Sequence, residues 1–150
     1  DLAARDKVRA EASKADFWPP VSGGVIEEQR SEIFRPLPVI GEFGSGDLGP
    51  IFEWREYTIS TGMMGTFKEW WSSGVPERRK VSPMVMAMES ELGELSKFIH
   101  IWGYKSFEER NKLRAETASN GIWPPPGIPE GALYRQRNMI CLAAPFSPVK

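Results

Sequence analysis

The sequence has one cysteine, one histidine and no long apolar run, and each shortage argues against a class of protein. Cys141 alone cannot form an internal disulfide. With His100 as the lone histidine, a zinc site of the usual Cys and His ligands is disfavoured. No stretch approaches the roughly 18 apolar residues that span a membrane. The net charge of −1 gives no basic field for nucleic acid.

Sequence motifs for bound groups are also missing. There is no Gly-rich phosphate loop, no G-x-S-x-G nucleophile motif and no carboxylate-rich metal motif, so no cofactor or metal is predicted. The chain begins at Asp1 without a start methionine or a signal peptide. We therefore expect it to be part of a longer, processed protein.

What the chain does contain is an internal repeat. A helical pattern over residues 2–15 ends in Trp-Pro-Pro, and a helical pattern over residues 107–119 ends in the same way. Eight of the sixteen positions from 5 to 20 are identical to those 105 residues later. They are Arg5, Lys7, Arg9, Ala10, Glu11, Trp18, Pro19 and Pro20, matched by Arg110, Lys112, Arg114, Ala115, Glu116, Trp123, Pro124 and Pro125.

The repeat predicts the domain organisation. Residues 1–38 are interpreted as the second half of a truncated module, with a helix and a strand at 25–36. Residues 39–50 are Gly-rich and predict a linker. Residues 51–150 then form a complete module, with strands at 51–60, 83–91, 97–105 and 132–144 and helices at 63–73 and 107–119. We expect Gly74 and Pro76 to kink or end the first of these helices.

The order β-α-β-β-α-β predicts an α+β, ferredoxin-like module. Its third strand is apolar on both sides: Ile99, Ile101 and Gly103 alternate with Phe98, His100, Trp102 and Tyr104. Something must therefore cover both faces of the sheet, and a second sheet that closes an α/β barrel is the expected cover. We expect strand 25–36 to pair with strand 83–91, and the sheet to face a second copy in a homodimer.

His100 is the main candidate for chemistry, because imidazole exchanges protons near neutral pH. Arg55 and Tyr57 share one face of the first strand and are predicted to approach it. Together they are candidate catalytic residues that could stabilise an anion or enolate. Phe98, Trp102 and Tyr104 are the predicted ligand-contacting residues of the barrel interior. The alternative is a filled barrel in which His100 is a satisfied interior group.

Several other side chains have a structural and a functional interpretation. Arg110 and Arg114, four apart on a helix, either bind an anion or partner or pair with carboxylates such as Glu53. The run 78–80, Arg-Arg-Lys, either binds phosphate or is a solvated face, and the second is favoured. Trp70, Trp71 and the neighbouring methionines are interpreted as core, Trp18 and Trp123 as anchors of the helix ends, and Cys141 as a small buried side chain.

Four stretches of the sequence carry a family resemblance: 53–71 (EWREYTISTGMMGTFKEWW), 75–85, 91–116 and 137–150. Together they resemble the NIPSNAP family. This resemblance implies a dimeric α/β barrel made of single or tandem modules. Some eukaryotic members are mitochondrial and act as protein-interaction factors in mitochondrial quality control, so a mitochondrial location is implied for a eukaryotic member and a cytoplasmic one otherwise.

Two function hypotheses follow. The first is a non-catalytic protein-interaction factor, which rests on the resemblance. The second is a small barrel enzyme, such as a cofactor-free oxygenase, isomerase or decarboxylase, that uses His100 with Arg55 and Tyr57. A solvent-connected cavity that touches His100 would favour the enzyme.

Overall fold

The computed structural model describes residues 1–17, 24–41, 43 and 46–150, and it divides into two units, Asp1–Ser31 and Glu32–Lys150. The first unit contains α1 (Leu2–Ala12), whose N-terminus is capped by the Asp1 carboxylate accepting from the Ala4 amide at 2.8 Å. The predicted helix is confirmed, although it ends before residue 15. The repeat residues Trp18, Pro19 and Pro20 lie outside the described residues.

The second unit is one antiparallel sheet with two helices, as predicted. The strands lie in the order β1-β3-β4-β2-β5, and every neighbouring pair is antiparallel. Without β1, this order and connectivity are consistent with the predicted ferredoxin-like arrangement. The elements are β1 (Ile33–Pro36), η1 (Pro38–Ile40), β2 (Ile51–Ile59), α2 (Met64–Arg79), β3 (Met84–Leu92), β4 (Lys97–Tyr104), α3 (Phe107–Ser119) and β5 (Leu133–Leu142).

The pairing of β1 with β3 confirms the expectation for the first strand, although the strand covers only residues 33–36. Ile33 lies opposite Leu92 and Pro36 opposite Met88. Lys97, at the start of β4, ties β4 to the residue before β1. Its Nζ forms ion pairs with Glu32 at 2.8 Å and Glu94 at 3.0 Å. The sheet is thus extended beyond β3 by a strand from before the Gly-rich stretch.

The predicted linker 39–50 is partly built into the core. Within it Ile40 is buried, and just before it Leu37 is also buried and donates its amide to the carbonyl of Ala87 at 2.9 Å. Further along, the chain crosses β4 so closely that a Cβ on Gly103 would lie 2.1 Å from the Leu48 carbonyl oxygen. Glycine at 103 is therefore required by this approach.

Helix α2 continues to Arg79, so the prediction that it ends or kinks at Gly74 and Pro76 is wrong as to its end. A proline inside a helix costs about 3 kcal/mol. Burial of Val75, just before the proline, and the hydrogen bonds from Arg78 to Ser82 and Tyr104 offset that cost. Gly74 faces the loop after α3, because a Cβ there would lie 2.3 Å from Cγ of Pro125.

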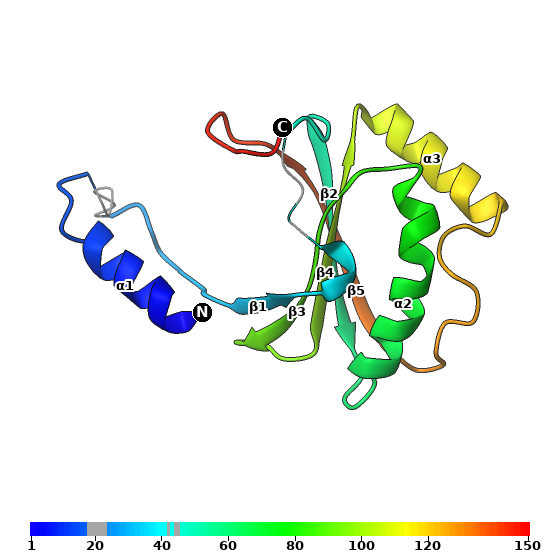
Figure 1. The fold of residues 1–150 in the computed structure, drawn as a ribbon, viewed down its shortest axis with the longest axis horizontal. Helices are drawn as coiled ribbons and strands as arrows, with labels where there is room; N and C mark the ends of the chain where they lie inside the picture. Colours follow the sequence, from blue (N-terminus) through cyan, green and yellow to red (C-terminus); the bar gives the residue numbers. More distant parts are fainter. Residues whose placement is uncertain (18–23, 42, 44–45) are drawn as a thin grey trace. The chain divides into compact units, whose positions relative to one another are not determined.

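The two helices lie on the same side of the sheet (Figure 1). On this side Phe67 and Trp71 of α2 contact Tyr57, Phe98 and His100. We expected the His100 side of β4 to form the interior of a barrel closed by a second sheet. That placement is wrong, because the helices of the same chain cover it.

No helix formed by the described residues of this unit lies on the opposite side of the sheet, which is called the open face. Trp54 pairs with Ile101 on one side and Met139 on the other, which sets a row of apolar side chains across β4, β2 and β5. The open face comprises Phe52, Trp54, Met86, Met88, Ile99, Ile101, Met139 and Cys141. Most of these are partly exposed, including Cys141, which was expected to be buried.

Candidate functional site

His100 lies between β4 and α2 and is fully buried. A spacing of two along the strand places Trp102 beside it, and the indole Nε1 donates to Nδ1 of His100 at 2.6 Å. The rings of Tyr57 and Trp71 each lie 5.1 Å from the imidazole ring. Burial, and then the positive charge of nearby arginines, hold the pKa of His100 well below its ordinary value of 6.5. The imidazole is therefore neutral.

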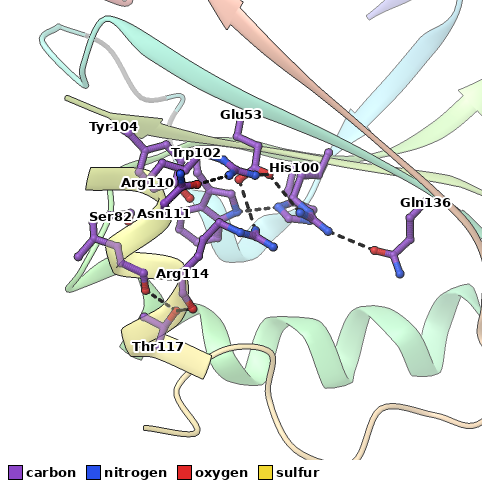
Figure 2. A network of polar contacts seen from close by, with 12 residues as sticks. Glu53, Ser82, His100, Trp102, Tyr104, Arg110, Asn111, Arg114, Thr117 and Gln136 are labelled. Carbon is purple, nitrogen blue, oxygen red and sulfur yellow. Dashed lines mark hydrogen bonds and ion pairs between the residues drawn. The ribbon is translucent and has the colours of Figure 1, made fainter. Parts of the chain in front are cut away.

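Glu53 of β2 is the carboxylate of the site, and it is completely buried. Its oxygens contact Arg55 at 3.1 Å, Arg114 at 3.4 Å and Arg110 at close range. Figure 2 shows Arg110 and Arg114 of α3 converging on Glu53. Burial raises the pKa of Glu53, but the hydrogen bond from Arg110 and the charges of Arg114 and Arg55 outweigh it and leave the pKa below 4.5.

The predicted pairing of the α3 arginines with a carboxylate such as Glu53 is thus confirmed. Helix α3 can present both of them because residues four apart share a face. Its start is set by Ser106, whose hydroxyl accepts from the Glu109 amide at 3.1 Å. The three arginines outnumber the carboxylate that they share, so the cluster carries an excess of positive charge.

Arg55 and Tyr57 come together as predicted. Nε of Arg55 donates to the phenol oxygen of Tyr57 at 2.9 Å, and Nη2 donates to Oε1 of Gln136 at 3.1 Å. Burial raises the pKa of the Tyr57 phenol, although Arg55 acts against this. Burial lowers the pKa of Arg55, but Tyr57 and Glu53 outweigh it and raise the pKa above its ordinary value. Both groups therefore keep their protons at neutral pH.

A pocket of about 260 Å³ opens beside this pair, between the sheet, the two helices and the loop after α3. We call it the Arg55 pocket. His100, Phe98, Trp102 and Tyr104 are not among the residues that line it. The predicted site is therefore divided, with Arg55 and Tyr57 at a pocket and the other four in the core. The polar and aromatic residues that line the pocket include Arg55, Tyr57, Trp70, Arg114, Trp123 and Gln136.

Trp123 contributes to the pocket wall and anchors the loop after α3, as predicted. The centroid of its ring lies 5.4 Å from that of Trp71 and 5.7 Å from that of Trp102. The Trp70 indole Nε1 donates to the carbonyls of Pro125 at 3.1 Å and Pro126 at 2.9 Å, which fixes the loop to α2. The Trp-Pro-Pro end of the repeat thus builds one side of the pocket.

Sequence reasoning missed the role of Arg78. The run 78–80 was interpreted as a solvated face, yet Arg78 is 2% exposed. Its guanidinium donates to Ser82 at 2.8 Å and to the Tyr104 phenol at 2.9 Å, and it lies 4.9 Å from the Trp102 ring centroid. Its position in a helix that packs on aromatic strands was the available signal. Gln136 was missed because a lone glutamine on a strand has no sequence signature.

No group of three His, Cys, Asp or Glu side chains is arranged for a metal ion within residues 1–17, 24–41, 43 and 46–150. Among these residues there is likewise no helix with the length and apolar character to cross a membrane.

An antiparallel sheet with two helices on one side defines an α+β protein, and its strand order is consistent with a ferredoxin-like fold. The NIPSNAP family model matches residues 52–148. The chain therefore belongs to the NIPSNAP family, as the sequence resemblance implied.

The relatives are NipSnap proteins of several eukaryotes. The chain is 34% identical over 104 residues to a NipSnap homolog of Dictyostelium discoideum, which covers 66% of the chain and 46% of that protein. It is 29% identical over 112 residues to NipSnap homolog 2 of Danio rerio, covering 75% of the chain and 37% of that protein. The chain thus spans less than half the length of the curated relatives it matches.

Solved structures agree with this assignment. A NIPSNAP family protein from Agrobacterium tumefaciens is 28% identical with a TM-score of 0.59, and the match covers 65% of the chain and 96% of that structure. A NIPSNAP-like domain protein from Burkholderia xenovorans is 26% identical with a TM-score of 0.60, covering 65% and 88%.

Proposed function

We propose that this NIPSNAP protein is a homodimeric α/β barrel that binds protein partners. The observation that carries the proposal is the open face, where Trp54, Ile101 and Met139 form a continuous apolar row across three strands. Two sheets that pack face to face lie about 10 Å apart and bury such rows against each other. A second copy supplies a matching apolar sheet.

The dimer is tested by light scattering coupled to size-exclusion chromatography. Wild type should elute as a dimer, and Ile101→Glu, which places a charge on the open face, should elute as a monomer. Leu95→Glu is the matched control, because Leu95 is 64% exposed in the turn between β3 and β4. A monomeric wild type, or a dimeric Ile101→Glu variant that retains its fold by circular dichroism, would contradict the proposal.

Residues 1–38 fit the same architecture. We propose that they are the second half of a module like 51–150, as the Trp-Pro-Pro repeat and the pairing of β1 with β3 both suggest. In this arrangement consecutive modules share a sheet edge, which satisfies the backbone groups that an isolated edge strand would expose.

The surface that we assign to protein partners is the outer edge of β5. In the described residues β5 pairs only with β2, and it exposes Tyr134 by 77% and Leu142 by 76%. An unpaired strand edge with exposed apolar side chains can accept a strand from another protein. The double variant Tyr134→Ser/Leu142→Ser should lose partners that co-purify stoichiometrically with wild type while remaining dimeric.

The alternative of a small barrel enzyme has less support. Acid–base chemistry requires that the proton carrier reach its substrate. His100 is neutral and accepts a hydrogen bond from Trp102. It does not line the Arg55 pocket. If His100 nevertheless carried catalysis, His100→Asn would abolish a turnover that wild type shows against a metabolite panel. We expect no such difference between the two proteins.

A further inference from the structure

We infer that the Arg55 pocket binds a small carboxylate with a flat apolar body. The pocket holds about 260 Å³, which is below the ~300–1,000 Å³ typical of sites for drug-sized ligands. Its occupant is therefore small, with one ring or a short chain. This inference does not depend on the dimer or on protein partners, because every residue it uses belongs to one chain.

The charge of the pocket selects an anion. Arg55 and Arg114 line it, and among the described residues no aspartate or glutamate does. Both guanidinium groups contact Glu53, but so does Arg110, and one carboxylate cannot neutralise three cations. A bound anion restores that balance in a partly buried setting, where charge interactions are stronger than in water.

Free hydrogen-bond donors face the same space. Arg114 is 38% exposed in its side chain and meets Glu53 only at 3.4 Å, so it can turn a donor to a ligand. The Tyr57 oxygen accepts from Arg55, which leaves its own proton to be donated. Gln136 likewise uses its Oε1 to accept from Arg55 and keeps its amide hydrogens for a ligand.

The remaining walls are apolar, and they set the body of the ligand. Trp70 and Trp123 contribute indole rings, and Phe67 and Leu133 also line the pocket. Trp70 is held by its bonds to the proline loop, so the wall is already in place without a ligand. Flat apolar groups pack well on such rings. Arginine binds carboxylates and phosphates alike, so it is the aromatic walls that favour a planar arylcarboxylate over a hydrated phosphate.

The test is isothermal titration calorimetry on the full chain with benzoate, cinnamate, benzamide and inorganic phosphate. Wild type should bind at least one of the two carboxylates saturably, and the neutral amide and phosphate should bind at least about tenfold more weakly. Arg114→Gln should weaken carboxylate binding by about tenfold or more, because a charged donor is lost. Arg137→Gln is the control: this exposed residue follows Gln136 on β5 and points to the opposite side of the sheet. It should bind like wild type.

Three results would overturn the inference. The first is the absence of saturable carboxylate binding up to about 10 mM, a range that includes even weak small-ligand sites. The second is equal binding of benzamide or phosphate, which would remove the selection for a carboxylate. The third is an Arg114→Gln variant that is folded by circular dichroism and binds as wild type does.

Discussion

The indole Nε1 of Trp102 donates a 2.6 Å hydrogen bond to Nδ1 of His100, two residues earlier on the same strand. Nδ1 is therefore an acceptor, and the neutral ring carries its proton on Nε2. That nitrogen is buried and has no hydrogen-bond partner in the part of the chain that the structure describes. Protonation of Nδ1 would place two donors against each other in the core. The geometry and the burial both keep His100 neutral.

The buried histidine makes stability depend on pH. Its folded pKa lies well below the ordinary 6.5, so below that pH the unfolded chain binds a proton that the folded chain does not. Stability should therefore fall as pH drops from about 7 to 5, by at most about 1.4 kcal/mol per pH unit for this group. Urea unfolding across this range should show a steeper loss in wild type than in His100→Asn. Parallel curves for the two proteins would contradict the prediction.

Removal of the shared carboxylate should be costly. Glu53→Gln leaves Arg55, Arg110 and Arg114 close together without their anion, and loss of one partner from a buried ion pair costs about 3–5 kcal/mol. Glu77→Gln is the control, because the side chain of Glu77 is 59% exposed in its pair with Lys80. It should cost less than about 1 kcal/mol. Similar urea midpoints for the two variants would refute the structural role of Glu53.

Two glycines of α2 should respond to alanine in opposite directions. At Gly74 a Cβ would meet Pro125 at 2.3 Å and the Trp123 ring at 3.1 Å, so Gly74→Ala should destabilise by about 1–3 kcal/mol. At Gly65 nothing lies within 4 Å, so Gly65→Ala should stabilise by up to about 1 kcal/mol. Thermal melts of both variants check the contact between α2 and the proline loop. If Gly74→Ala leaves the melting temperature unchanged, the contact between α2 and the proline loop adjusts without a cost in stability.

The docking of β1 should depend on Lys97. Its side chain is 9% exposed and contacts Glu32 and Glu94, so Lys97→Gln leaves these carboxylates facing each other without a cation. The amides of residues 33–35 and 37 should then exchange about tenfold faster or more, while β4 stays protected. Lys80→Gln, in an exposed pair, is the control. Unchanged exchange at these residues would mean that backbone pairing alone holds β1.

The local sequence pattern predicted the helices and strands well, because it reflects the backbone preferences of neighbouring residues. The aromatic and β-branched run at 97–105 became β4, and the Ser106 cap began α3 close to where it was expected. The pairing of β1 with β3 followed from the need to satisfy an edge strand. Helix α2 was predicted too short, because helix propensity accounts for Pro76 but not for the tertiary hydrogen bonds of Arg78 beyond it.

The sequence by itself determined the strand and helix order, the family, and which side chains of each strand share a face. These depend on periodicity and composition, which are properties of the linear chain. Only the tertiary structure decided which face the helices cover, and with it the burial of His100 beside Trp102 and the opening of a pocket at Arg55. Alternation along a strand has the same form whichever face is covered, so that choice depends on packing between distant segments.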